Sequence, residues 1–163
     1  MKRIARFEKV SIEQFRQGYS EEDFEGVYGD IRLPVRATAG SAGYDFFAPF
    51  DITLKPGESA KIPTGIRVWI ENGWLLSIYP RSGLGFKFRL QLDNTVGIID
   101  ADYYNSDNEG HIFVKITNDS REGKTLNIAS GTGFAQGIFT EFGITVDDSA
   151  DGVRNGGFGS TTR

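Results

Sequence analysis

Cysteine is absent from the 163 residues of the chain. This absence excludes disulfides, thiolate zinc sites and cysteine nucleophiles together. Histidine is scarce as well, and the single residue His111 cannot form a histidine metal cluster. Because it lies between Gly110 and Ile112 at the start of an expected strand, we expect His111 to be a surface residue.

Long hydrophobic runs are also missing. No segment approaches the roughly 18 consecutive apolar residues that a membrane-spanning helix needs. The opening residues MKRIARFEKV carry two early basic side chains but no apolar segment of the kind found in signal peptides. These features predict a soluble cytoplasmic protein, or an intracellular one if the source is a virus, with no membrane partner.

An excess of positive charge is the third feature that the sequence lacks. The formal net charge of −4 disfavours a general nucleic-acid surface, so we expect no nucleic-acid partner. A polyphosphate ligand would have to be met by local arginine or lysine side chains, backbone amides or a cation. The length of 163 residues predicts one domain with a core of its own.

Glycine and phenylalanine are abundant, at 21 and 13 residues, which suits many short strands joined by tight turns. From residue 31 onwards, apolar runs bounded by turn residues recur every eight to twelve residues or so. This spacing predicts an all-β sandwich or barrel of the jelly-roll kind. Two hairpins are expected, one joining residues 51–54 to 59–62 and one joining 66–70 to 74–79.

The first 30 residues differ from the rest, and we interpret them as an N-terminal arm. Ser11 and Gln14 fit a capping box, which predicts one short amphipathic helix. The acidic run EEDFE follows at residues 21–25. Adjacent acidic residues of this kind are usually solvated, so we assign the arm no chemistry.

Residues 91–104, QLDNTVGIIDADYY, place turn-forming residues between two apolar runs. This arrangement is typical of a β-hairpin or bulged loop that leaves backbone N–H and C=O groups available to a ligand. If the following residues are extended, Asp100 and Asp102 share one face and Tyr103 lies on the other. The residues alone allow two interpretations: a surface turn with a solvated Asp100, or a positioned general base.

Three further segments carry weaker signals. The turn PRSGLGFK at residues 80–87 combines Arg81 with glycines that let backbone amides approach an anion, and Ser82 is placed to cap a short helical turn. Asp45 lies among apolar neighbours and therefore needs a hydrogen-bond or cation partner. Gln136 lies in an apolar run, where it either satisfies its amide inside or points outward.

The C-terminal residues 151–163 contain too many glycines and hydroxyl side chains to form a core strand. They are therefore either disordered or ordered by a ligand. The alternation of Arg154, glycines, Phe158 and hydroxyl residues suits a flap whose amides and hydroxyls wrap a phosphate while the phenyl ring covers a flat ring.

Taken in order, five segments resemble the motifs of the trimeric dUTP diphosphatase (dUTPase) family. They are AGYDFFA at 42–48, PRSGLG at 80–85, NTVGIIDADY at 94–103, GFAQGIF at 133–139 and RNGGFGST at 154–161. The resemblance spans residues 31–163 and leaves the first 30 uncovered. Each motif alone is a weak signal, but five in the family's order and spacing are specific.

The resemblance implies a jelly-roll-like subunit of the β-clip type that forms a homotrimer with active sites at the subunit interfaces. It divides the chain into an N-terminal arm at 1–30, a β-domain at 31–150 and a C-terminal tail at 151–163 that covers the phosphates and uracil. The implied reaction is Mg²⁺-assisted hydrolysis of dUTP to dUMP and pyrophosphate. This reaction keeps dUTP low, prevents uracil incorporation into DNA and supplies dUMP for dTMP synthesis.

Carried over residue by residue, the resemblance makes Asp100 the general base for the water that attacks the α-phosphorus. Tyr103 would stack against the deoxyribose and exclude UTP. Asp45 would help to hold a hydrated Mg²⁺ through water. The uracil-reading residues would be Asn94, Gly97, Ile98 and Ile99. The phosphate-binding residues would be Arg81, Ser82, Gly83 and Gln136, joined from the tail by Arg154, Gly159, Ser160 and Thr161, while Phe158 would stack on uracil.

The chain departs from the family pattern in four places. The spacing between Arg154 and Phe158 is one residue shorter than usual, and Thr162 stands where glycine is common. After Tyr103, the longer sequence YNSDNEG replaces a short link and is expected to form a surface loop. The segment GTGFAQ lacks the charged residues that commonly precede its Ala-Gln pair.

Two alternative functions come from the same fold or the same pocket. A dCTP deaminase is expected to need a glutamate in the uracil-reading region, where this chain has Asp100 and Tyr103. A non-catalytic trimeric sensor would bind dUTP to control a partner protein. The presence of Asp100, Asp45 and the tail argues against a loss of catalysis.

Overall fold

The computed structural model describes residues 1–154. In this part of the chain, no helix is long and apolar enough to cross a membrane. The elements, in chain order, are β1 (Ala5–Lys9), α1 (Ile12–Gly18), α2 (Phe24–Asp30), β2 (Val35–Arg36), β3 (Tyr44–Phe47), β4 (Ile52–Leu54), β5 (Ser59–Pro63), β6 (Ile66–Ile70), β7 (Trp74–Pro80), α3 (Ser82–Phe88), β8 (Leu90–Leu92), β9 (Gly97–Ile99), the 3₁₀ helix η1 (Ala101–Asn105), β10 (Phe113–Asn118), β11 (Leu126–Ile128) and β12 (Gly133–Glu141).

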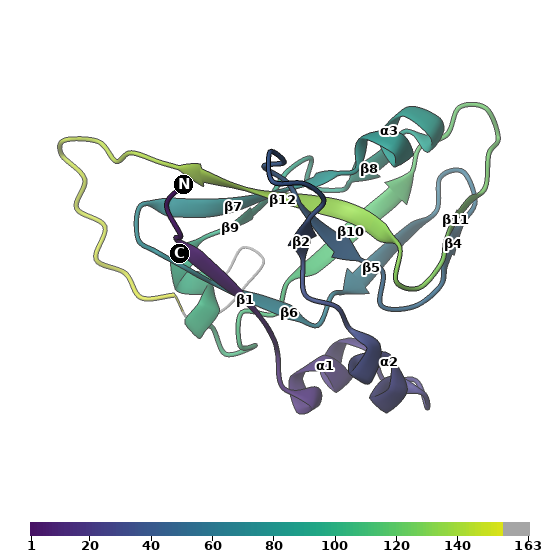
Figure 1. Cartoon of the computed structure of the whole chain (residues 1–163), viewed down its shortest axis with the longest axis horizontal. Helices are drawn as coiled ribbons and strands as arrows, with labels where there is room; N and C mark the ends of the chain where they lie inside the picture. The colour runs from purple at the N-terminus through teal and green to yellow at the C-terminus, as the bar shows by residue number, and fades with distance from the viewer. Residues whose placement is uncertain (155–163) are drawn as a thin grey trace.

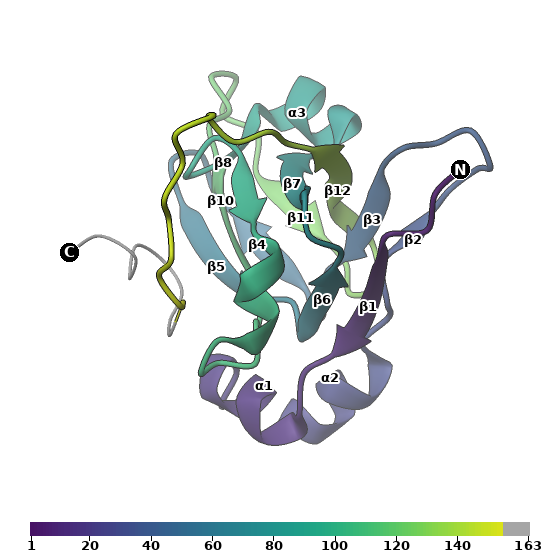
Figure 2. The same cartoon turned by 90° about the vertical axis from the view of Figure 1, so that its left-hand side faces the viewer.

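Short strands form most of the regular secondary structure, as predicted (Figure 1). The largest sheet has the order β2-β3-β12-β7-β9, and a three-stranded sheet has the order β5-β10-β8. Two smaller sheets pair β1 with β6 and β11 with β4. Helices α1 and α2 lie at one end of this β structure and α3 at the other (Figures 1 and 2).

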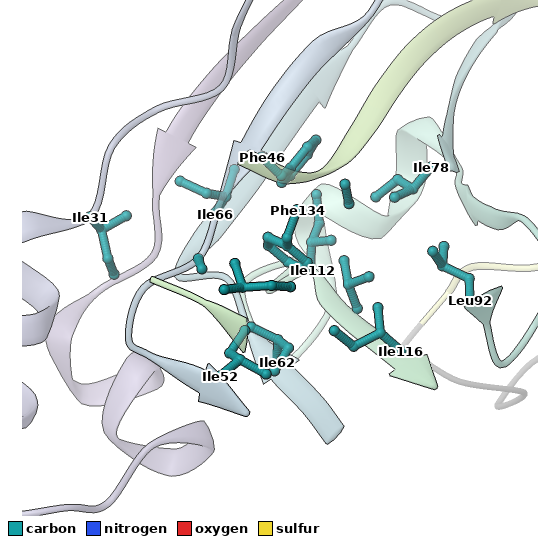
Figure 3. Packing of buried hydrophobic residues seen from close by; sticks show 14 of the residues in the cluster. Ile31, Phe46, Ile52, Ile62, Ile66, Ile78, Leu92, Ile112, Ile116 and Phe134 are labelled. Atoms are coloured by element: carbon teal, nitrogen blue, oxygen red, sulfur yellow. The ribbon is translucent and has the colours of Figure 1, made fainter. Parts of the chain in front are cut away.

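The core lies between these sheets (Figure 3). Strand β10 shows how the sequence produces it, since alternate residues of FVKITN point inward and bury Val114 and Ile116. Strand β12 has neighbours on both edges and begins with a continuous buried run that contains Phe134 and Ala135. Two of the largest buried side chains, Phe46 and Phe134, come from the same sheet that carries the segments around Asp45 and Gln136.

The N-terminal region contains more structure than the short helix predicted for it. Ser11 caps α1 by accepting a hydrogen bond from the Gln14 amide at 3.1 Å. Strand β1 pairs with β6 in the register Ala5↔Ile70 to Lys9↔Ile66, and Phe15 of α1 is fully buried. Sequence analysis did not predict β1 or α2, although both belong to the compact part of the chain.

Both predicted hairpins are wrong in their pairing, although their four strands are present. Strand β4 pairs with β11 and β5 with β10, while β6 pairs with β1 and β7 with β12 and β9. Turn residues predict that the chain reverses. They do not reveal that it passes from one sheet into another at each of these turns, as the strands of a jelly roll do.

Candidate active site

The central turn connects β8 to β9 and contains the first group of predicted site residues. The Thr95 amide donates to the Leu92 carbonyl at 2.9 Å and the Val96 amide donates to the Asn94 carbonyl at 2.7 Å. Thr95 adopts a φ of 66°, which makes the reversal tight. The turn does not close a hairpin as one interpretation expected, because β8 pairs with β10 and β9 with β7.

Asp100 lies just after β9, at the N-cap position of η1. The chain therefore bends into a 3₁₀ turn at this point, and the alternation expected of an extended strand does not occur. This turn directs Tyr103 into the protein, where 6% of the residue is exposed. Asp100 itself remains accessible, with 45% of its side chain exposed.

A pocket of about 300 Å³ opens between the β8–β9 turn, η1 and the start of β10. We call it the turn pocket. Seven predicted site residues line it: Asn94, Gly97, Ile98, Ile99, Asp100, Tyr103 and Arg154. The other lining residues are Ile78, Leu92, Val96, Ile112, Phe113 and Val114. A pocket lined mostly by apolar residues, with a carboxylate at its edge, is thus formed largely by the segment 91–104 that the sequence indicated as a ligand-binding turn, joined by Arg154.

The Tyr103 ring faces this pocket, while its hydroxyl is bonded inside the protein. The hydroxyl donates to the His111 carbonyl at 2.8 Å and accepts from the Asn108 side-chain amide at 2.8 Å. Burial raises the pKa of Tyr103, and the Asn108 hydrogen bond and the Arg154 charge oppose that rise. The residue therefore presents an uncharged ring to the pocket.

Arg154 lies at the edge of the turn pocket and bridges two carboxylates. Its Nη2 is 2.5 Å from Asp100 Oδ2 and its Nε is 2.9 Å from Asp102 Oδ1. Its guanidinium carbon is 6.0 Å from the centre of the Tyr103 ring. The resemblance assigned Arg154 to the phosphates, whereas in the structure this side chain lies beside Asp100.

A second pocket, of about 440 Å³, contains the other predicted residues, and we call it the anion pocket. Asp45, Arg81, Ser82, Gly83 and Gln136 line it, together with Ala37, Ser41, Gly43, Leu84, Thr132 and Gly133. The structure thus groups the predicted phosphate residues with the predicted magnesium residue. The two pockets have no lining residue in common.

The anion pocket contains charged and amide side chains that are partly exposed. Arg81 Nε lies 3.2 Å from Asp45 Oδ1, with 42% of the arginine side chain exposed, and Gln136 donates to the Pro80 carbonyl at 3.1 Å. Helix α3 begins at Ser82 with Arg81 as its N-cap and no side-chain cap bond, so the prediction that Ser82 caps the turn is wrong. Ser82 instead provides one of the first amides of α3, which have no carbonyl partner within the helix.

The residues of the anion pocket suit Mg²⁺ held mostly by phosphate and water. No group of three or more metal-ligating side chains occurs within residues 1–154. A single carboxylate, Asp45, is available there, and one of its oxygens already contacts Arg81. Mg²⁺ keeps several waters and commonly binds one or two carboxylates together with substrate phosphates, so this sparse set fits a hydrated ion that arrives with a polyphosphate.

His111 is buried rather than on the surface, which corrects the prediction. Its Nε2 accepts a hydrogen bond from the Gly65 amide at 2.9 Å, and burial lowers its pKa to about 4. The rings of Phe15 and Phe113 cover it, with centroids 6.3 and 4.3 Å from its own. The prediction was wrong because it considered only the neighbours in sequence and not the packing of α1.

Asn108 hydrogen-bonds the pocket residue Tyr103 but was missed by sequence analysis, since NSDNEG was expected to be an ordinary surface loop. A polar loop that replaces a shorter link next to Tyr103 was the available signal. Four of the predicted tail residues, Phe158, Gly159, Ser160 and Thr161, lie outside the described residues.

Comparison with known proteins shows one consistent similarity. Residues 30–162 match the family model for dUTPase. A deoxyuridine 5′-triphosphate nucleotidohydrolase of Lactococcus lactis is 42% identical over 134 residues, which are 80% of this chain and 88% of that protein. The crystal structure of dUTPase from Streptococcus mutans has a TM-score of 0.66 at 32% identity, covering 87% of this chain and 98% of that one. A Staphylococcus bacteriophage 80alpha dUTPase, solved with dUpNHpp, has the same TM-score at 20% identity and covers 94% and 100%.

Proposed function

The chain belongs to the dUTPase family, and we propose that it hydrolyses dUTP to dUMP and pyrophosphate. One observation supports the assignment most strongly. The turn pocket brings Asp100, Asn94, Gly97 and Tyr103 together, although they come from a turn, a strand and a 3₁₀ helix. A carboxylate at the edge of a pocket lined mostly by apolar residues suits recognition of a base beside a hydrolytic centre.

Uracil and its sugar occupy the turn pocket in this proposal. Asn94 and the backbone from Gly97 to Ile99 read the uracil edge and reject cytosine, whose donors and acceptors are reversed. A Cβ added to Gly97 would lie 3.3 Å from Ile78 Cβ and 3.8 Å from Asn94 Nδ2, so a side chain there would intrude on the reading groups. Tyr103 packs against the deoxyribose and leaves no space for a 2′-hydroxyl.

Asp100 orients the attacking water and accepts its proton as the α–β phosphoanhydride is cleaved. Its Oδ2 is paired with Arg154, while no described residue donates a hydrogen bond to its Oδ1. Arg154 therefore has to release Asp100, or share it with the water, when nucleotide binds. The tail residues Phe158, Gly159, Ser160 and Thr161 then close over uracil and phosphates and exclude water.

The triphosphate lies in an anion pocket, where Arg81, the α3 amides and Gln136 hold its negative charge. Asp45 would hold a hydrated Mg²⁺ through water, and the ion would supply positive charge to the phosphates. Since the turn pocket and the anion pocket of one chain share no residue, we propose that a complete site combines the turn pocket of one subunit with the anion pocket of a neighbour in a homotrimer. A cytoplasmic location suits this role in nucleotide metabolism.

Pyrophosphate release from dUTP, dCTP, dTTP and UTP, measured in parallel with Mg²⁺, tests the function. The wild-type protein is expected to turn over dUTP alone. Asp100→Asn should lower kcat by about 10²–10⁴-fold, because it removes the general base. Asp102→Asn is the matched control, since Asp102 also pairs with Arg154 but does not line the turn pocket.

Three outcomes would contradict the proposal. Equal losses in the two variants would show that pairing with Arg154, not proton transfer, is what Asp100 provides. Ammonia released from dCTP would indicate a deaminase. Tight dUTP binding without pyrophosphate from any substrate would indicate a nucleotide sensor.

A further inference from the structure

The loop between Tyr103 and β10 is held from two sides. On one side the loop contacts the side chain and main chain of Tyr103. On the other it contacts the N-terminal region, of which residues 1–29 lie outside the part of the chain that matches the dUTPase family. Figure 2 shows this loop, in green, next to α1. Its last three residues before His111 are Asn108, Glu109 and Gly110, which we call the Tyr103 clamp.

Asn108 fixes the tip of the Tyr103 ring. Its Nδ2 donates to the Tyr103 hydroxyl at 2.8 Å, and its Oδ1 accepts from the Gly110 amide at 3.1 Å. The hydroxyl donates in turn to the His111 carbonyl. Both hydrogen-bonding roles of the hydroxyl are thus used inside the protein, and the ring position follows the position of the loop.

Gly110 fixes the other end of the same residue. It adopts a φ of +70°, and a Cβ at this position would lie 2.7 Å from the Tyr103 carbonyl oxygen and 2.8 Å from Tyr104 Cα. These are backbone atoms, which cannot turn aside as a flexible side chain can. The clamp therefore contacts Tyr103 at both its hydroxyl and its main chain.

The N-terminal region holds the clamp in place through Glu109. The Ser11 amide and hydroxyl donate to the Glu109 carboxylate at 2.7 and 2.5 Å. Glu109 has a φ of 58°, a left-handed conformation that a non-glycine residue adopts only when its surroundings hold it. Partial burial raises the pKa of Glu109, but the hydrogen bonds from Ser11, together with nearby positive charge such as that of Arg67, lower it overall.

The start of the loop is anchored by two strands. The Tyr104 hydroxyl donates to Glu8 of β1 at 2.7 Å, and Arg67 of β6 donates to the Tyr104 carbonyl at 2.7 Å. Three buried side-chain atoms in the described structure have no hydrogen-bond partner: Arg67 Nε, Ser106 Oγ and His111 Nδ1. All three lie in or against this loop, so its conformation is kept although it leaves polar groups unpaired, as is common where a conformation serves function.

We propose that Asn108, Glu109 and Gly110, held by Ser11, are positioning residues that set the place of the Tyr103 ring and thereby the discrimination between deoxyribose and ribose. This inference rests on the proposed function, in which Tyr103 packs against the sugar. The N-terminal region would then contribute to sugar specificity, because it holds the loop that positions the Tyr103 ring.

The test compares Gly110→Ala with Gly123→Ala. Both glycines have a φ near +70°, so both changes introduce similar backbone strain, but a Cβ on Gly123 meets nothing within 4 Å. Since a misplacement of about 1 Å can alter rates by up to 10²-fold, we expect Gly110→Ala to lower the ratio of kcat/KM for dUTP to that for UTP by about tenfold. Gly123→Ala should leave this ratio unchanged.

Ser11 provides a second test that does not strain the loop. Ser11→Gly removes the hydroxyl that binds Glu109 while costing the α1 cap only a few tenths of a kcal/mol. It should lower the dUTP-to-UTP ratio by about threefold, and Ser11→Thr should restore it, because threonine keeps the hydroxyl. Unchanged ratios in both Gly110→Ala and Ser11→Gly, with thermal stability alone reduced, would overturn the inference.

Binding measurements separate this inference from the function on which it rests. Calorimetry with the non-hydrolysable α,β-imido analogues of dUTP and UTP reads the sugar preference without turnover. If the wild-type protein prefers the deoxy analogue but hydrolyses nothing, the proposed function fails; a preference lost in Gly110→Ala would then still support the clamp. If the wild-type protein hydrolyses dUTP and Gly110→Ala keeps the full preference, the clamp fails and the function stands.

Discussion

The turn pocket and the anion pocket differ in how they are built. In the turn pocket the key ring is 6% exposed and its hydroxyl bonds are both made within the chain. In the anion pocket the key cation, Arg81, is 42% exposed and rests against Asp45. A buried ring whose hydroxyl is hydrogen-bonded within the chain suits recognition of a ligand by its shape. Exposed charged side chains suit a ligand that carries charge and brings cations with it.

This difference indicates a division of labour. In the proposed function, the hydrogen bonds within the chain hold the turn pocket ready for the nucleotide, so this pocket would discriminate by the space that it leaves. The anion pocket is completed by the ligand, so its contribution should appear in triphosphate affinity and in charge stabilisation during reaction. Changes in one pocket should therefore leave the task of the other intact.

The largest effect on this comparison is expected from Arg81→Ala. Because we propose that Arg81 binds the phosphates, removing this charged donor should lower kcat/KM for dUTP by about 10²–10³-fold. Affinity for deoxyuridine, which has no phosphate, should not change. Arg89→Ala is the matched control, because Arg89 pairs with Asp119 at 3.1 Å and lines neither pocket. A parallel loss of deoxyuridine affinity in Arg81→Ala would show that the pockets are not separate in function.

Lowering the pH is expected to have a smaller effect, which is a loss of folding stability through His111. The main-chain carbonyl of this residue accepts the hydrogen bond from Tyr103 of the turn pocket. The pKa of buried His111 is about 4 in the folded chain, below its ordinary value of 6.5. The unfolded chain therefore binds the proton first as pH falls, and stability is full above pH 6.5 and decreases toward pH 4. Between pH 7.5 and pH 5 the loss from this residue should be about 2 kcal/mol.

Urea unfolding at these two pH values measures that loss. His111→Gln keeps an acceptor for the Gly65 amide but does not titrate, so its stability should change less over the same range. The groups that act on the pKa of His111 besides burial are Glu109, which raises it, and Lys61, which lowers it. If wild type and His111→Gln lost the same stability between these pH values, the acid sensitivity would arise from residues other than His111.

Changes in the Tyr103 clamp are expected to affect activity less than Arg81→Ala does. The ratio of kcat/KM for dUTP to that for UTP should fall about tenfold in Gly110→Ala and about threefold in Ser11→Gly. These variants test whether the two pockets act independently, because they should displace the Tyr103 ring in the turn pocket and leave the anion pocket unchanged. Their effect should be confined to the sugar, and the preference for uracil over cytosine should remain.

Sequence reasoning predicted the positions of most strands and the fold class, because period-two alternation and turn residues act locally. It failed where the answer depended on distant contacts. The strands flanking Gly57 and Gly73 proved to belong to different sheets, and His111 proved to be buried under α1. No local pattern encodes either result.

The site shows the same limit. The family motifs pointed to residues such as Asp100 and Arg81, and the structure places them in two pockets that have no lining residue in common, which the sequence alone did not reveal. Asn108 and Glu109 escaped prediction because their role depends on contacts with Tyr103 and Ser11 across the fold. A polar loop gives no sign of such contacts until the chain is folded.

Mixing two inactive variants tests the central claim most directly, namely that a complete site joins the turn pocket of one chain to the anion pocket of another. Asp100→Asn and Arg81→Ala proteins are each expected to be nearly inactive. Unfolded together and refolded at equal amounts, they should regain activity at roughly a quarter of the wild-type level, because random assembly pairs an intact turn pocket with an intact anion pocket in about that share of interfaces. No recovery in mixed trimers that have formed would contradict the account, since it would show that each site is built within one chain.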